Sequence, residues 1–174
     1  MSEMTLVKPA LKWKDAYINY YKEWLESGET MIPWVIEKDP YAFDEMIEFL
    51  ENNERGVYLP PGWVPDTTYW MMDKQERIIG VTNIRHKLTD RLRKEGGHIG
   101  YSIRPSERRN GYATTLLRLS LEKAWEMKIT DVLVVCDQWN TGSWKAILKN
   151  GGKEDQDFVE EDGNVVKRFW ISRK

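Results

Sequence analysis

The segment of residues 98–136 constrains the fold more than any other part of the chain. Residues 98–103 have the apolar and aromatic character of a strand, and a turn containing Gly111 separates them from a helical pattern. Residues 131–136 form a nearly continuous apolar run, which is typical of a strand covered on both faces. A strand, a helix and a strand in this order predict a parallel crossover, and such crossovers are right-handed. The chain is therefore expected to build a sheet that contains a parallel pair.

Helices are also expected on both sides of this segment. A first helix follows from an apolar stripe at helical spacing, and a second begins at Pro40 with Asp39 as its N-cap. Another helix begins at Asn140 and stops at Gly151, a favourable left-handed end. The residues expected to face inward are Trp13, Ala16, Tyr17, Tyr20, Tyr21, Trp24 and Leu25, then Phe43, Met46, Ile47 and Leu50, and finally Trp144, Ile147 and Leu148.

Hairpin patterns account for most of the remaining chain. Residues 67–72 and 77–84 flank a polar tetrad, and residues 165–171 form the last strand of a second hairpin. Residues 87–97 are charged and end in two glycines, which predicts a mobile connection. Together these elements predict the α/β class, with a mixed, mostly antiparallel twisted sheet of six to seven strands flanked by about four helices.

Length, charge and cysteine content limit the classes of function. The 174 residues are expected to form a single domain over 1–174, and a net charge of -2 argues against a nucleic-acid surface. One cysteine, Cys136, excludes an intramolecular disulfide framework and a cysteine-based zinc site. The sequence has no signal-peptide pattern and no apolar run near the roughly 20 residues of a membrane helix. A cytoplasmic protein without a membrane partner is expected.

The turn before the helix of this segment has the features of an anion site. Residues 108–113 connect the strand to the helix, and Gly111 permits a close backbone approach. The first turn of a helix leaves backbone N–H groups without intrahelical partners, and the helix dipole adds partial positive charge there. A phosphate group is therefore the expected ligand of this turn.

Two motifs resemble a known family. Arg108-x-x-Gly111-x-Ala113, between a strand and a helix, resembles the acyl-CoA signature of the GNAT family of N-acetyltransferases. The run Asn140-Thr141-Gly142-Ser143, followed by an apolar helix, resembles the family region that flanks the pantetheine arm. The resemblance in the order of elements covers roughly residues 67–172, whereas the first 66 residues match as a strand, two helices and a variable loop.

The resemblance implies a GNAT-like fold and an acetyl-CoA site. The fourth and fifth strands would be parallel and splayed, with the thioester in the gap between them. The acceptor amine would approach from the side of the N-terminal helices. Strand residues would offer backbone groups to the pantetheine, and the helix turn would hold the pyrophosphate. The residues implied to contact acetyl-CoA are Tyr101, Ser102, Ile103, Arg108, Arg109, Asn110, Gly111, Tyr112, Ala113, Thr114, Asn140 and Ser143.

The resemblance leaves the proton donor open. Many family members have a tyrosine seven residues after the motif asparagine, and this chain has Ile147 at that position. Tyr101, Cys136 and Ser143 are substitutes that the sequence does not rank, although a lone cysteine in an apolar strand is more often a buried apolar residue. His98 is either a proton relay facing the acceptor or a strand-edge histidine in solvent.

Acidic residues near the end of the first helix also have two interpretations. Glu23, Glu26 and Glu29 either attract a cationic amine or form a solvated face. The predicted function is acetyl transfer from acetyl-CoA, as co-substrate and without a metal, to a primary amine of a small molecule or peptide by direct attack. A non-catalytic acyl-CoA-binding sensor or recruitment domain is the alternative, and a nucleotide-binding module is third. A homodimer is a further expectation.

Overall fold

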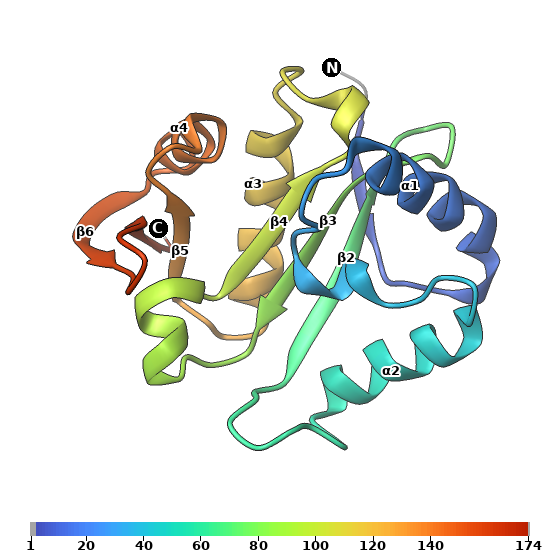
Figure 1. Ribbon diagram of the computed structural model, residues 1–174, viewed down its shortest axis with the longest axis horizontal. Coiled ribbons are helices and arrows are strands. Elements are labelled where there is room, and N and C mark those ends of the chain that lie inside the picture. The colour runs from blue at the N-terminus through green and yellow to red at the C-terminus, as the bar shows by residue number, and fades with distance from the viewer. Residues whose placement is uncertain (1–2, 174) are drawn as a thin grey trace.

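The strands of the protein form two separate antiparallel sheets (Figure 1). The computed structural model describes residues 3–173, and every ladder in it is antiparallel. The first sheet has the order β1 (Thr5–Val7), β2 (Asp66–Met72), β3 (Ile78–Arg85) and β4 (Ile99–Ile103). The second sheet has the order β5 (Asp131–Asp137), β7 (Val165–Ser172) and β6 (Lys153–Val159).

The sheet expected from the sequence is divided between β4 and β5. No ladder joins these two strands within the described part of the chain, so the predicted parallel pair is not confirmed. The strands touch at one end, where the His98 N–H donates a hydrogen bond to the Leu133 carbonyl oxygen at 2.7 Å. Each strand instead pairs along its other edge, β4 with β3 and β5 with β7. The α/β class and the two predicted hairpins are confirmed.

Two helices cover one face of the first sheet (Figure 1). They are α1 (Lys14–Ser27) and α2 (Phe43–Arg55). The Tyr17 ring of α1 stacks on Trp70 of β2, with 4.5 Å between the ring centroids. Phe43 of α2 is buried in the same cluster, together with the other three residues predicted to face inward from this helix. Aromatic packing therefore fixes α1 on the sheet.

Three details of the helices differ from the sequence predictions. The second helix begins at Phe43, because Asp39 Oδ1 accepts a hydrogen bond from the Tyr41 N–H at 2.8 Å and stabilises a turn before the helix. Leu25 and Leu148 are exposed, by 52% and 46%, although both were expected to face inward. The neighbouring Trp24 and Ile147 take the inward positions, and successive helix residues point about 100° apart.

The opposite face of the first sheet is covered by α3 (Tyr112–Glu126), which also contacts α4 (Thr141–Lys149) (Figure 1). Leu117 and Leu121 of α3 are buried in one cluster with Ile99 of β4 and Val134 of β5. This shared cluster joins the two sheets through apolar contacts where backbone pairing is missing. The core therefore continues across the division between β4 and β5.

The connection from β3 to β4 is folded against the second sheet. A helical turn at Leu92–Gly96 replaces the mobile connection expected for this loop. Gly97 follows with a φ of +64°, and a Cβ atom there would lie 2.6 Å from the Leu133 carbonyl oxygen. A side chain does not fit in this space, so glycine allows the loop to approach β5 closely.

Candidate functional site

The middle of β4, the edge strand of the first sheet, is partly exposed where it faces β5. Ile99 and Ile103 at the ends of β4 are buried, whereas the three residues between them are partly exposed. Val135 and Asp137 of β5 are partly exposed as well. We call the space between residues 100–102 and residues 135–137 the strand gap. Because β5 does not pair with β4, the β5-facing edge of β4 is available for a ligand with its own hydrogen-bonding groups.

His98 closes one end of the strand gap. Its Nδ1 accepts a hydrogen bond from the Leu133 N–H at 2.9 Å, and its own N–H donates to the Leu133 carbonyl oxygen. Burial, together with a smaller effect of the nearby charges of Arg93 and Arg85, lowers the pKa of His98 to about 4. The ring is therefore neutral at neutral pH and joins the two sheets. These contacts are those of a positioning residue.

Tyr101 and Ser143 face each other across the strand gap. Their side-chain oxygens lie 2.7 Å apart, which brings β4 and α4 together. Burial raises the pKa of Tyr101 above the usual range, so this phenol stays protonated. Burial, together with a smaller effect of the nearby charge of Asp137, raises the pKa of the Cys136 thiol to about 11. Cys136 is 7% exposed and protonated, in agreement with its interpretation as a buried apolar residue.

Ile147 is fully buried at 0% exposure and packs in the cluster shared by the two sheets. It lies on α4, the helix that also holds Ser143. Ile147 has no proton to donate, so the substitute donors named from the sequence become relevant. Two of the three, Tyr101 and Ser143, share one hydrogen bond.

The turn between β4 and α3 presents unpaired backbone N–H groups. Gly111 is the N-cap of α3 with a φ of +79°, and Arg109 also has a positive φ, of 64°. Within the described residues, the N–H groups of Tyr112, Ala113 and Thr114 have no hydrogen-bond partner. Nothing lies within 4 Å of the position that a Gly111 Cβ would take. The turn is therefore open and carries the positive end of a helix dipole.

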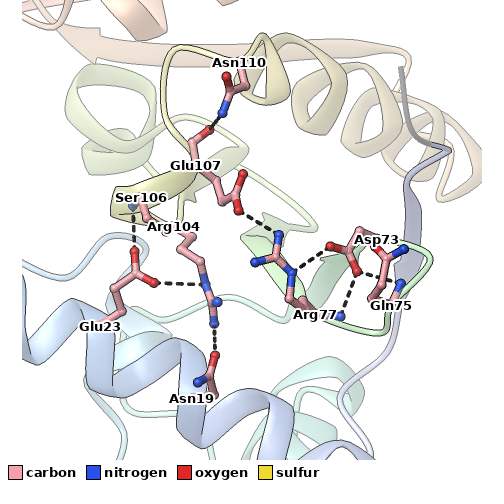
Figure 2. A network of polar contacts seen from close by, with 9 residues as sticks. All are labelled: Asn19, Glu23, Asp73, Gln75, Arg77, Arg104, Ser106, Glu107 and Asn110. Carbon is pink, nitrogen blue, oxygen red and sulfur yellow. Dashed lines mark hydrogen bonds and ion pairs between the residues drawn. The ribbon is translucent and has the colours of Figure 1, made fainter.

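A polar network fixes the start of this loop to α1 (Figure 2). Arg104 is 4% exposed, and its Nη2 donates to Asn19 Oδ1 at 2.7 Å. Its Nε lies 3.5 Å from Glu23 Oε2, and the other oxygen of Glu23 accepts from the Ser106 N–H at 2.6 Å. One carboxylate of α1 thus binds both a side chain and the backbone of the loop.

A second set of contacts holds the same loop to the hairpin of β2 and β3 (Figure 2). Arg77 Nη2 donates to Glu107 Oε1 at 2.7 Å, and Arg77 Nε donates to Asp73 Oδ2 at 3.0 Å. The Glu107 carbonyl oxygen accepts from Asn110 Nδ2 at 3.2 Å. The loop that precedes the helix turn is therefore fixed from two sides, which preorganises its backbone.

The two arginines of the motif have different surroundings. Arg108 forms two hydrogen bonds of 2.8 Å with the carboxylate of Glu29, and its guanidinium lies 5.3 Å from the Trp24 ring centroid. These hydrogen bonds lower the pKa of Glu29. Arg109 is exposed and has no ion pair among the described residues. Arg109 is therefore the cation of this turn that is available to an anion.

Two of the three acidic residues near the end of α1 form ion pairs with arginines of the loop that enters α3. Glu23 and Glu29 bind Arg104 and Arg108, so both carboxylates are already occupied by arginines. Glu26 is exposed and forms no ion pair with a described residue. These contacts do not favour the interpretation that the acidic residues steer a cationic amine.

The start of α4 agrees with the sequence prediction. Asn140 Oδ1 accepts a hydrogen bond from the Ser143 N–H at 3.1 Å, as expected of an N-cap. Sequence reasoning missed Asn150, whose Nδ2 donates to the Thr114 carbonyl oxygen at 3.1 Å and to the Ala146 carbonyl oxygen at 2.8 Å. Asn150 connects the end of α4 to the first turn of α3. The only signal near Asn150 in the sequence was Gly151, which indicates the end of the helix. That signal does not reveal the hydrogen bond from Asn150 to Thr114.

Residues 3–173 contain neither a cluster of metal ligands nor a helix suited to a membrane. No group of three or more His, Cys, Asp or Glu side chains in this range is arranged to hold a metal ion. Within the same range, no helix combines the length and the apolar character needed to cross a membrane.

Comparison with known proteins gives one family and many similar folds. The family model described as "Acetyltransferase (GNAT) domain" matches residues 6–153. A search of curated proteins finds no significant match. Three solved structures illustrate the likeness in fold, all below 25% identity.

A spermidine N-acetyltransferase SpeG chimera from Vibrio cholerae and hSSAT has 21% identity and a TM-score of 0.64, with 98% of this chain and 96% of that chain covered. The dodecameric spermidine N-acetyltransferase from Vibrio cholerae has 18% identity and a TM-score of 0.65, with 97% and 93% covered. Mycobacterium smegmatis RimJ in complex with CoA-disulfide has 16% identity and a TM-score of 0.70, with 97% and 81% covered.

Proposed function

Because the chain belongs to the GNAT family of acetyltransferases, we propose that it moves an acetyl group from acetyl-CoA to a primary amine by direct attack. The observation that carries the proposal is the open helix turn at the end of the strand gap. Unpaired N–H groups at the start of α3 suit a pyrophosphate, and the exposed edge of β4 suits the amide groups of a pantetheine arm. The two features lie on consecutive elements of the chain.

Each predicted contact residue has a role in this proposal. The backbone across the turn holds the pyrophosphate, and Arg109 adds charge, while Arg108 stabilises the loop through Glu29. Backbone groups of residues 101–103 bind the pantetheine arm. Asn140 and Ser143 border the arm on the side of α4. The residues proposed for the turn are Arg108, Arg109, Asn110, Gly111, Tyr112, Ala113 and Thr114.

Acetyl transfer needs one proton to leave the amine and one to reach the sulfur. The amine nitrogen attacks the thioester carbon and loses a proton to water, the C–S bond breaks, and the thiolate accepts a proton as CoA leaves. Tyr101 is our proposed donor, because its raised pKa keeps it protonated and Ser143 lies 2.7 Å away to relay a proton. The catalytic role predicted for His98 stays a prediction, and its bond from Leu133 favours a positioning role.

Calorimetric titration with acetyl-CoA tests the site, with ATP and NAD as control ligands. We expect one-to-one binding of acetyl-CoA and no comparable binding of the other two. Gly111→Glu should weaken acetyl-CoA binding at least tenfold, because it places negative charge beside the phosphates. Gly163→Glu is the matched control, since Gly163 also has a positive φ and open space around its Cβ position. Equal affinity of the two variants would show that the turn does not hold the pyrophosphate.

The alternative is a non-catalytic acyl-CoA-binding domain. The observation that favours it is Ile147, which is buried where many relatives have a tyrosine. Acetyl-CoA binding without thiol release over a broad panel of amines would support this alternative. The homodimer and the cytoplasmic location stay predictions.

A further inference from the structure

A polar cluster lies beside the strand gap on the face of β4 opposite Tyr101. Its centre is Gly100, which is partly exposed and pairs in register with Asn83 of β3. A Cβ atom at Gly100 would lie 3.2 Å from Arg85 Nη2 and 3.3 Å from Pro33 Cβ. The guanidinium therefore lies directly over a residue that has no side chain. The neighbouring Pro33 comes from the segment between α1 and α2.

Arg85 has no negatively charged partner in direct contact. Its Nη1 donates to the carbonyl oxygens of Gly96 and Gly97, at 2.9 and 3.4 Å, and it forms no ion pair with a described residue. Asp66 lies opposite in the β2–β3 register, but its carboxylate accepts from Asn83 at 2.6 Å and from Asn53 at 3.5 Å. Burial lowers the pKa of Arg85, and the charge of Asp66 offsets this only in part, so an anionic ligand in direct contact would stabilise the guanidinium further.

Three arginines around the site are paired, whereas Arg85, like the exposed Arg109, has no ion pair among the described residues. Arg77, Arg104 and Arg108 all form ion pairs with carboxylates. The carbonyl contacts of Arg85 account for Nη1 and leave Nη2 over Gly100. An arginine that presents a free guanidinium edge is suited to a carboxylate, which it can bind through two parallel hydrogen bonds.

Asn83, two positions before Arg85 on β3, has an unsatisfied acceptor. Its Nδ2 donates to Asp66 and Thr68, both on β2, so its Oδ1 lies on the side of the carboxamide away from those two groups. This oxygen has no hydrogen-bond partner among the described residues, and Asn83 is 0% exposed. The cluster is therefore closed at Asn83 and accessible at Arg85 and Gly100, which are both partly exposed.

Resting on the proposed acetyl transfer, we propose that Arg85 binds the carboxylate of the acceptor and that the acceptors are free amino acids. Arg85 lies over Gly100, at one end of the β4 segment that borders the strand gap. A strand rises about 3.4 Å per residue, so Gly100 is about 7 Å from Ser102 at the other end of this segment. The amine of an amino acid is two bonds from its carboxylate carbon. With its carboxylate at Arg85 over Gly100, the amino acid would present its amine towards the middle of the strand gap. A polycation would instead be repelled by the guanidinium.

Acceptor preference is the direct test. Thiol release from acetyl-CoA would be measured with the twenty L-amino acids, their carboxamides, which lack the carboxylate, and spermidine as a polycation. For the best amino acid, kcat/KM should exceed that of its carboxamide at least tenfold. Equal or faster turnover of the carboxamides or of spermidine would overturn the proposal, and so would the absence of turnover with every amino acid.

Variants of Arg85 distinguish binding of the acceptor carboxylate from support of the loop at Gly96 and Gly97. In Arg85→Gln, the ratio of kcat/KM for the amino acid over its carboxamide should fall at least tenfold, and Arg85→Lys should retain part of the ratio because it keeps the charge. Arg118→Gln is the control, because Arg118 pairs with Glu122 on an exposed helix surface. A purely structural role would change both rates alike and leave the ratio intact, which would contradict the proposal.

Calorimetry with acetyl-CoA distinguishes failure of this inference from failure of the proposed function. Acetyl-CoA binding together with turnover of other amines, but not of amino acids, removes the amino-acid assignment alone. Loss of both acetyl-CoA binding and turnover removes the proposed function and the inference with it.

Discussion

Tyr101 and Ser143 are the residues whose side chains meet across the strand gap, 2.7 Å apart. We expect Tyr101→Phe to lower kcat about 10- to 100-fold, because the thiolate then lacks its proton donor. The Kd of acetyl-CoA should stay within a factor of three, since the proposed cofactor contacts of this residue use its backbone. Steady-state rates and calorimetry measure the two effects. An unchanged kcat would show that water supplies the proton.

His98 makes stability depend on pH. Its pKa of about 4 in the folded protein lies below its ordinary value of 6.5, so the unfolded chain binds more protons between these values. The free energy of unfolding should therefore fall as pH decreases from 6.5 towards 4, by at most about 1.4 kcal/mol per pH unit from this group. Above pH 6.5 both states are neutral and the contribution is constant.

His98→Asn tests this pH dependence, because asparagine Oδ1 can still accept the hydrogen bond from the Leu133 N–H without titrating. Urea unfolding of both proteins at pH 7, 6, 5 and 4 measures the difference. The variant should lose less stability than the parent protein as the pH falls. Parallel pH profiles would contradict the assignment of a neutral, buried histidine.

The roles of residues that act on backbone close to them in sequence were predictable. The roles of residues that bind distant partners were not. Gly111 and Asn140 act on backbone within a few positions, so the pattern around each was sufficient. Arg108 binds Glu29, 79 positions away, and His98 binds Leu133, 35 positions away. Such pairs depend on how the helices and sheets pack together, which a single sequence does not reveal.

At the scale of elements, α1 controls the position of the loop that enters α3. We expect Glu23→Gln to lower the free energy of unfolding by about 1–3 kcal/mol, because the buried Arg104 loses its charged partner. Acetyl-CoA affinity should fall as well, since Glu23 also binds the Ser106 N–H. Urea unfolding and calorimetry measure these changes.

Glu26→Gln is the matched control for this prediction. Glu26 lies on the same helix but is exposed. Its substitution should change stability by less than about 0.5 kcal/mol. Equal effects of the two variants would show that charge on α1, rather than the contact with Arg104, determines stability.

The helices illustrate where sequence patterns succeed. The apolar spacing of α1 and the N-cap of α4 predicted both helices, because these signals act within one element. The predicted start of α2 was wrong because Asp39 can stabilise a turn as well as the start of a helix. The turn at Leu92–Gly96 was missed because its contact with β5 through Gly97 is a tertiary one.

At the scale of the whole molecule, two sheets meet through one pair of hydrogen bonds at His98 and a shared apolar cluster. A ligand in the strand gap would contact both sheets. Acetyl-CoA at 100 times its Kd should stabilise the fold by about 2.7 kcal/mol. For a domain of this size the melting temperature should rise by about 5–10 °C. Thermal scans with and without acetyl-CoA measure this shift, and ATP serves as control.

The order of strands was predictable from the residues, whereas the separation of β4 from β5 was expected only from the resemblance to the GNAT family. Apolar residues in β5 predicted a covered strand, and Val132, Leu133 and Val134 are indeed buried. Apolar character alone does not distinguish cover by a paired strand from cover by α3 and the loop around Gly97. For that reason the apolar run by itself did not reveal that no ladder joins β4 and β5 among the described residues.

The separation of the two sheets also bears on how the chain folds during synthesis. Every ladder of the first sheet is complete once residue 103 has been made, and the cluster under α1 and α2 draws on residues no later than Val81. No strand of this sheet therefore waits for a partner that the ribosome adds later. The N-terminal part can close its hydrogen bonds while the second sheet is still being translated, which shortens the time that its strand edges stay exposed to other chains.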